Sequence, residues 1–179
     1  MALNNDQQSS RIVTGLFHDR DSAEHAYTTV AERGYHRDDV NVVMSDDTRL
    51  RHFPNDSVMV TELGSKAAEG AGIGGAIGGT LGAIAAAIAA IGTTLVLPGL
   101  GLVVAGPIAA AIAGAGAGSV TGGLVGALIG WGLPEERVKH YEDGIRDGGI
   151  LMGVTARNEE DARHFEQEWK AKNGEQVYL

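Results

Sequence analysis

The sequence predicts an α+β fold, in which a small α/β sandwich is interrupted by a long α-helical hairpin rich in glycine and alanine. Three observations lead to this prediction. Charged side chains lie almost entirely in residues 1–69 and 135–179, whereas residues 70–134 contain no Asp, Glu, Lys, Arg or His. Each charged stretch contains a strand, helix and strand pattern. The uncharged stretch carries glycine at four-residue spacing, which is typical of closely packed helices.

The first charged stretch predicts a strand, a helix and a second strand. Residues 11–17 (RIVTGLF) and 40–44 (VNVVM) have the apolar, β-branched composition of strands. Between them, Asp21 is expected to cap the helix, with Glu24 as its reciprocal partner. Gly34 supplies the left-handed residue that ends this helix.

The second charged stretch predicts a helix followed by a second strand, helix and strand unit. Pro134 fits the first turn of a helix, where a missing N–H costs nothing. Residues 150–156 (ILMGVTA) read as a strand, Asn158 as the cap of a second helix, and residues 176–179 as a last strand. The apolar faces of the two helices are expected to be Val138, Tyr141 and Ile145, and Ala162, Phe165 and Trp169.

The two units share a faint repeat that favours a ferredoxin-like α/β sandwich (split βαβ … αβαβ). In both, a glycine of the first strand, Gly15 or Gly153, precedes an aromatic residue, Tyr27 or Phe165, by twelve positions. Such a sandwich has one four-stranded antiparallel sheet with helices on one face; the alternative is a coincidence of two generic patterns. If both units complete one sheet, the uncharged stretch must leave and return on the same side, as a hairpin. The predicted parts are a flexible tail at 1–10, the first half-domain with a linker at 11–69, the hairpin at 70–133 and the second half-domain at 134–179.

The glycines of the hairpin are predicted to pack helices against one another. Glycine costs a solvated helix up to about 1 kcal/mol per residue relative to alanine, so close packing must compensate. The predicted packing residues are Gly70, Gly74, Gly78 and Gly82 in the first arm, and Gly114, Gly118, Gly122, Gly126 and Gly130 in the second. Large residues of the second arm form their own row: Ile108, Ile112, Val120, Leu124 and Leu128.

The connection between the two arms, residues 93–107 (TTLVLPGLGLVVAGP), is apolar although it breaks the helical pattern. The predicted turn residues are Pro98, Gly99, Gly101, Gly106 and Pro107. Because a turn in water is ordinarily polar, this tip should be buried in lipid, in a neighbouring copy or against the body of the protein. Arms of about 28 to 33 residues would be roughly 42–50 Å long, which exceeds the roughly 30 Å hydrocarbon core of a bilayer.

The sequence resembles bacterial general stress proteins of the heat-induced type, and the glycine-zippered low-temperature-induced proteins related to them. The resemblance covers most of the chain and rests on three segments: residues 15–47, the glycine-rich stretch GAGIGGAIGGTLGA, and residues 134–154 (PEERVKHYEDGIRDGGILMGV). It implies a stress-associated role without an assigned biochemistry. No functional residue is carried over from the family.

The sequence offers no support for an enzyme, a cofactor or a metal. A net charge of −9 argues against a nucleic-acid partner, and the absence of cysteine excludes disulfides and thiolate sites. Residues 70–75 match GxGxxG, but no strand precedes them and the glycine zipper explains them better. His18 and His25, near Asp19 and Asp21, fit solvated surface residues better than metal ligands. We therefore predict no catalytic residue, no cofactor, no metal and no small-molecule substrate.

Three functional hypotheses follow. The first is a non-enzymatic, stress-associated hairpin protein embedded in the bacterial inner membrane, with membrane lipid as partner, self-association through glycine zippers and both termini cytoplasmic. Its α/β domain would serve assembly or partner contact, and Lys and Arg on both sides of the hairpin agree with both ends inside. The second is a cytoplasmic homo-oligomer whose hairpins form a shared helical core or shell. The third is a ligand-binding ferredoxin-like domain with a membrane anchor.

Overall fold

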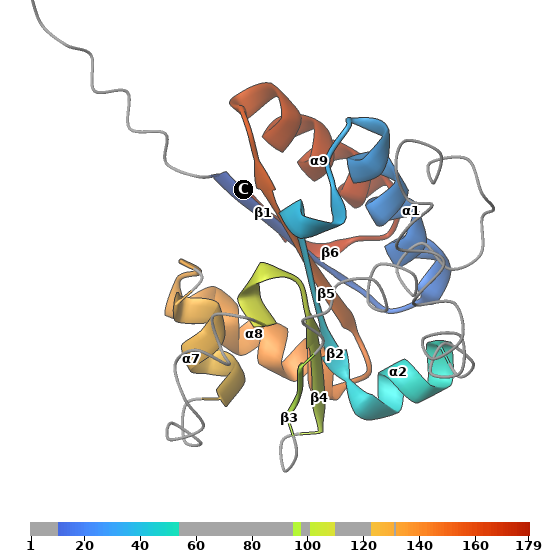
Figure 1. Cartoon of the computed structure of the whole chain (residues 1–179), viewed down its shortest axis with the longest axis vertical. Coiled ribbons are helices and arrows are strands. Elements are labelled where there is room, and N and C mark those ends of the chain that lie inside the picture. Colours follow the sequence, from blue (N-terminus) through green and yellow to red (C-terminus); the bar gives the residue numbers. More distant parts are fainter. Residues whose placement is uncertain (1–10, 54–94, 98–100, 110–122, 131) are drawn as a thin grey trace, which may run out of the picture.

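The computed structural model describes residues 11–53, 95–97, 101–109, 123–130 and 132–179. They form a mixed α/β structure around one six-stranded antiparallel sheet of order β3-β4-β2-β5-β1-β6 (Figure 1). The strands are β1 (Arg11–Phe17), β2 (Val40–Ser45), β3 (Leu95–Leu97), β4 (Leu102–Ala105), β5 (Ile150–Ala156) and β6 (Glu175–Tyr178). The helices are α1 (Arg20–Glu32), α2 (Asp46–His52), α7 (Gly123–Gly130), α8 (Glu135–Arg146) and α9 (Glu159–Ala171), with a 3₁₀ turn, η1 (Arg37–Asp39).

The prediction that both charged stretches build one sheet is confirmed. β1 from the first stretch lies antiparallel to β5 from the second, with partners from Arg11↔Ala156 to Phe17↔Ile150. β5 also pairs with β2, and β1 with β6, so strands from the two stretches are neighbours throughout this part of the sheet. The predicted strands agree with the observed ones to within one residue at each end.

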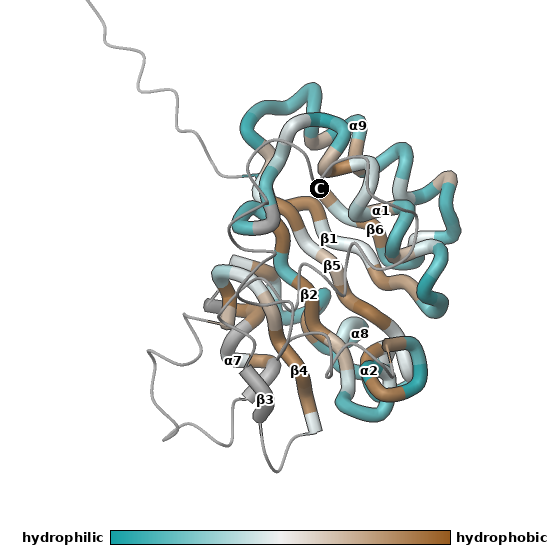
Figure 2. The backbone as a smooth tube through the Cα atoms, turned by 45° about the vertical axis from the view of Figure 1, so that its right-hand side comes forward, coloured by the Kyte–Doolittle hydropathy of each residue, from teal (hydrophilic) through white to brown (hydrophobic). Residues whose placement is uncertain are grey.

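Helices cover both faces of the sheet, so the expectation that they lie on one face is wrong. α1 and α9 enclose the α1-side core, whose largest fully buried members are Phe17, Met44, Phe53, Ile150, Met152, Phe165 and Trp169. α7 and α8 enclose the α8-side core, which includes Leu16, Val43, Leu102, Val104, Ile108, Leu128, Val138, Tyr141, Ile145 and Leu151. The strands point apolar residues to both sides, and a sheet that is apolar on both faces needs a layer on each. Figure 2 shows the hydrophobic strands between these layers and the hydrophilic outer turns of α1 and α9.

Helix caps follow local rules, with one correction. Asp19, not Asp21, caps α1, and its Oδ1 accepts the N–H of Ser22 at 2.8 Å. The helix begins at Arg20, so Ser22 is its third residue and donates to the cap. Asn158 caps α9 as predicted and accepts the N–H of Asp161 at 2.7 Å.

The predicted apolar turn between two helical arms is instead a β-hairpin that widens the sheet. β3 and β4 pair from Leu95↔Val104 to Leu97↔Leu102, and β4 pairs with β2 from Val42↔Ala105 to Ser45↔Leu102. Apolar and β-branched residues favour strand once the free edge of β2 is available. Of the predicted turn residues, Gly101 lies in the hairpin turn with φ +60°, Gly106 follows the last residue of β4 with φ +103°, and Pro107 begins a helical segment at 107–109.

Much of the uncharged stretch lies outside the described residues. This applies to the flexible tail predicted at 1–10 and to the predicted positions Gly70, Gly74, Gly78, Gly82, Pro98, Gly99, Gly114, Gly118 and Gly122. Within the described ranges, no helix has both the length and the apolar character that a membrane span requires.

Candidate functional site

The helix α7 contains the predicted packing glycine whose surroundings are described. Gly126 is exposed, and a Cβ atom added there would meet no atom of the described residues within 4 Å. Ile129, one turn further on the same side, leaves 43% of its surface exposed. Leu128, on the opposite side, is fully buried in the α8-side core. α7 therefore has one side held by the protein and one open side with a glycine and a large apolar residue. Gly130 ends this helix.

The open side of α7 is held in a fixed direction. Gly132, with φ +100°, donates its N–H to Ile129 O at 2.8 Å, and Leu133 donates to Leu128 O at 3.0 Å. These bonds close the end of the helix and turn the chain into α8. Leu133 and Val138 are buried beside Leu128, so α7 and α8 share one core.

Residues 106–109 are locked onto the sheet by a buried asparagine. Asn41, the second residue of β2 and only 2% exposed, accepts the backbone N–H of Ile108 through Oδ1 at 2.8 Å. Gly106 lies so close to β2 that an added Cβ would be 2.4 Å from Val40 O. Ile108 and Ala109 are buried in the α8-side core. The two described segments that flank positions 110–122, residues 106–109 and α7, thus both contribute side chains to the α8-side core.

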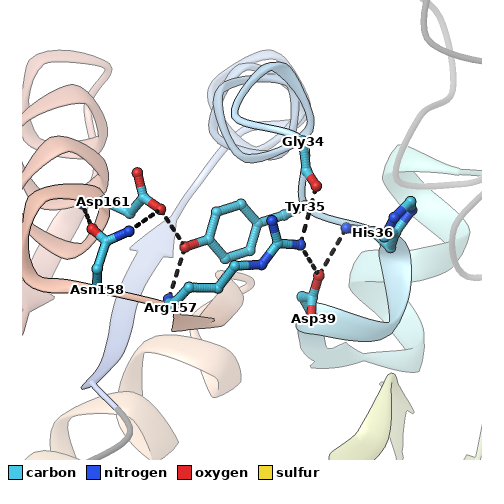
Figure 3. A network of polar contacts seen from close by, with 7 residues as sticks. All are labelled: Gly34, Tyr35, His36, Asp39, Arg157, Asn158 and Asp161. Carbon is cyan, nitrogen blue, oxygen red and sulfur yellow. Dashed lines mark hydrogen bonds and ion pairs between the residues drawn. The ribbon is translucent and has the colours of Figure 1, made fainter. Parts of the chain in front are cut away.

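A polar network joins the loop after α1 to the start of α9 (Figure 3). The hydroxyl of Tyr35, a 5% exposed residue, accepts the backbone N–H of Arg157 at 2.8 Å and donates to Asp161 Oδ2 at 2.7 Å. Asn158 Nδ2 donates to the same carboxylate at 3.0 Å. Burial raises the pKa of Tyr35 above its ordinary value, and the Asp161 carboxylate adds to this rise.

The Arg157 side chain completes this network over the face of Tyr35. Its guanidinium carbon lies 4.0 Å from the ring centroid, and Nη2 donates to Gly34 O at 3.0 Å and to Asp39 Oδ2 at 3.2 Å. Asp39 also accepts the N–H of His36 at 2.8 Å. These groups satisfy one another's hydrogen bonds. The arrangement is therefore a clamp between the two charged stretches of the chain.

A second buried hydroxyl, that of Tyr141, also joins the two halves. It lies 2.7 Å from Thr14 Oγ1 and donates to Gln176 O at 2.8 Å, which ties α8 to β1 and β6. Thr14 and Tyr141 are both fully buried. Burial raises the pKa of Tyr141 to about 12.

Two of the four side chains considered as metal ligands have other contacts. Asp19 caps α1, and His18 Nε2 lies 3.3 Å from Glu175. Across the described part of the chain, no group of three or more His, Cys, Asp or Glu residues could hold a metal ion. The GxGxxG stretch at 70–75 lies outside the described residues.

Comparison with family models, curated proteins and solved structures finds no match for this chain. Its function has to be inferred from its own residues. The structure confirms that Gly126 lies in a helix, whereas its role in helix packing stays a prediction. The sequence did not indicate the exposed Ile129 beside it or the clamp around Tyr35. Tyr35 and Asp161 are 126 positions apart, so no local pattern could have paired them.

Proposed function

We propose that this chain is a non-enzymatic, self-associating protein of the stress-associated type that its sequence resembles. One observation carries the proposal: α7 is fixed by buried Leu128 on one side and presents Gly126 and Ile129 on the other. A glycine lets a second backbone approach closely, and the neighbouring isoleucine supplies apolar area that such an approach would bury. The partner that fits this side is the same side of another copy.

The scaffold of this assembly is a ferredoxin-like core. Its support is the order β2-β5-β1-β6, with α1 and α9 as the crossovers that lie together on one face. β4 and β3 extend this core at the β2 edge, and α7 and α8 cover its other face. The added layer presents α7 away from the clamp, so self-association leaves the two halves of the core undisturbed.

Chain connectivity supports association between copies over insertion into a bilayer. Residues 54–94 connect Phe53, which lies in the α1-side core, to β3, which belongs to the sheet. The two ends of this stretch are therefore held by the same α/β structure. A path across a bilayer and back needs about 40 apolar residues, whereas the uncharged part of this stretch is residues 70–94.

The test is to size the full-length chain without detergent and to fractionate cells under alkaline carbonate. The proposal expects the chain in the carbonate supernatant, and it expects a species larger than the 18.6 kDa monomer in sedimentation velocity. Recovery only in the membrane pellet, released by detergent, would instead support the hairpin protein embedded in the inner membrane. A monomer at all accessible concentrations, with or without detergent, would contradict self-association both in water and in the membrane.

A further inference from the structure

The turn between α9 and β6 is built on an Asn-Gly pair, Asn173 and Gly174. Asn173 is exposed and has φ +61°, the left-handed conformation in which a helix commonly ends. The helices α1, α7 and α8 are followed by a residue of the same conformation, and in each case it is a glycine: Gly34, Gly132 and Gly148. Glycine would serve the end of α9 at a lower conformational cost, so the turn alone does not explain the asparagine.

An Asn-Gly pair has a reactivity of its own, and asparagine is among the thermolabile residues of proteins. The backbone nitrogen of Gly174 can attack Cγ of Asn173, because glycine has no side chain to hinder the approach. The new N–Cγ bond closes a five-membered succinimide, the Cγ–Nδ2 bond breaks, and the amide proton leaves with the side-chain nitrogen as ammonia. Water then opens the ring at either carbonyl, which gives aspartate or isoaspartate. Isoaspartate makes the backbone longer by one methylene group.

The folded turn restrains the nitrogen that would attack. The N–H of Gly174 donates to Trp169 O at 2.8 Å, and the N–H of Lys172 donates to Glu168 O at 3.1 Å and to Trp169 O at 3.2 Å. These bonds lie at the end of a helix beside an edge strand, a kind of segment that opens locally without unfolding of the whole domain. Each opening of the turn frees the nitrogen of Gly174 for the reaction.

We propose that Asn173 is a self-modification site, and that its conversion to isoaspartate releases β6 from the edge of β1. Gly174 has no spare room, because an added Cβ atom would lie 2.6 Å from Trp169 O and 3.0 Å from Phe17 Cε1. A backbone that is one methylene longer immediately before Gly174 cannot keep this glycine both in that space and bonded to Trp169. The modified turn therefore does not close again. This inference is independent of the proposed self-association.

The strand β6 is weakly held, so a displaced turn is sufficient to detach it. Its pairing with β1 shifts register between Thr14 and Leu16, and Gln176 has φ +49°, which side chains rarely adopt. Its anchors are Val177, which is 5% exposed in the α1-side core, and the carbonyl of Gln176, which accepts the hydroxyl of Tyr141. Release of β6 uncovers the outer edge of β1, which otherwise lies inside the sheet.

The test of the site is to age the full-length chain in a mildly alkaline buffer, folded and in urea, and to map its peptides by mass spectrometry. We expect conversion of Asn173 in the folded chain to be roughly ten- to a hundredfold slower than in urea, because its rate follows the fraction of open turns. Asn158, which is exposed but followed by Glu159, is the internal control and should stay intact. A folded chain that keeps Asn173 over a period that would reveal a rate about a thousandfold below that in urea overturns the proposal.

The test of the release is hydrogen exchange of the aged chain, with the isoaspartate-containing peptide followed separately. The amides of β6 should lose protection in the modified fraction, while those of β5 keep it. Asn173→Gly is the matched variant, because it retains a residue that suits the left-handed turn but cannot form the succinimide. Its β6 should stay protected after the same ageing. Equal protection of β6 in the modified fraction and in Asn173→Gly overturns the release.

Discussion

At the scale of single residues, two tyrosine hydroxyls connect parts of the sequence that are more than a hundred positions apart. Tyr35 joins the loop after α1 to α9, and Tyr141 joins α8 to Thr14 in β1. A hydrogen bond formed in a buried site contributes modestly, but a partner left unpaired costs much more. These hydroxyls should therefore contribute to folding stability rather than to chemistry.

Tyr35→Phe should lower the free energy of unfolding by about 1–3 kcal/mol, because it leaves the N–H of Arg157 without its acceptor and removes a donor to Asp161. Tyr178→Phe is the matched control. It removes an exposed hydroxyl bond to the Gln176 side chain and should cost less than about 0.5 kcal/mol. Urea denaturation at neutral pH measures both. Equal losses in the two variants would show that the clamp adds no stability.

The raised pKa of Tyr141 predicts a loss of stability at high pH. The folded state holds this proton up to about pH 12, whereas the unfolded chain loses it near the ordinary value of 10.0. The stabilisation is complete below pH 10 and declines as pH rises towards 12, by up to about 1.4 kcal/mol per pH unit. Denaturation between pH 9.5 and 11.5 should show a steep decline that is shallower in Tyr141→Phe. Part of the decline in stability with pH should remain in this variant, because the pKa of Tyr35 is also raised. An identical slope in the variant would contradict the assignment to Tyr141.

At the scale of elements, the structure departs most from the sequence prediction at β3 and β4. The strands β1, β2, β5 and β6 and the helices α8 and α9 could be predicted, because alternation, helical spacing and caps such as Asn158 are local signals. Residues 95–105 gave no such signal, since whether LVL and LVVA form strands depends on the edge of β2, more than 50 positions away. Local sequence signals also could not predict which way Gly126 faces, because the packing of Leu128 against the residues of α8 orients the helix α7.

Gly106→Ala tests whether the hairpin packs against β2 as described. Both Gly106 and Gly34 have positive φ, so alanine at either position bears a conformational cost of about 1–2 kcal/mol. Only at Gly106 would the new Cβ also meet a backbone oxygen, that of Val40, whereas at Gly34 the space is open. Gly106→Ala should therefore cost clearly more than Gly34→Ala. It should also speed hydrogen exchange of the amides in β4, while those in β1 and β5 stay protected. Equal costs and an unchanged β4 would mean that the hairpin lies elsewhere.

At the scale of the whole molecule, the uncharged segments gather in one region. The polar outer turns of α1 and α9 cover one face of the sheet, whereas β3, β4 and α7 lie at the other end of the molecule, where the charged helices α2 and α8 contact β4 and α7 (Figures 1 and 2). The uncharged stretch is therefore not separated in space from the charged parts of the chain. This arrangement was not predictable, because the uncharged stretch contributes strands to the sheet and residues to the α8-side core.

The sedimentation of Gly126→Leu tests the central claim most directly. A Cβ atom at this position would meet no described atom within 4 Å, so we expect the fold to be retained, whereas a leucine would fill the space through which a second backbone approaches. His140→Leu, on the exposed part of α8, is the control for an added apolar side chain. We expect the wild type and His140→Leu to sediment as the same oligomer, and Gly126→Leu to sediment as a smaller species with an unchanged circular-dichroism spectrum. An oligomer of unchanged size in Gly126→Leu would contradict association through the glycine side of α7.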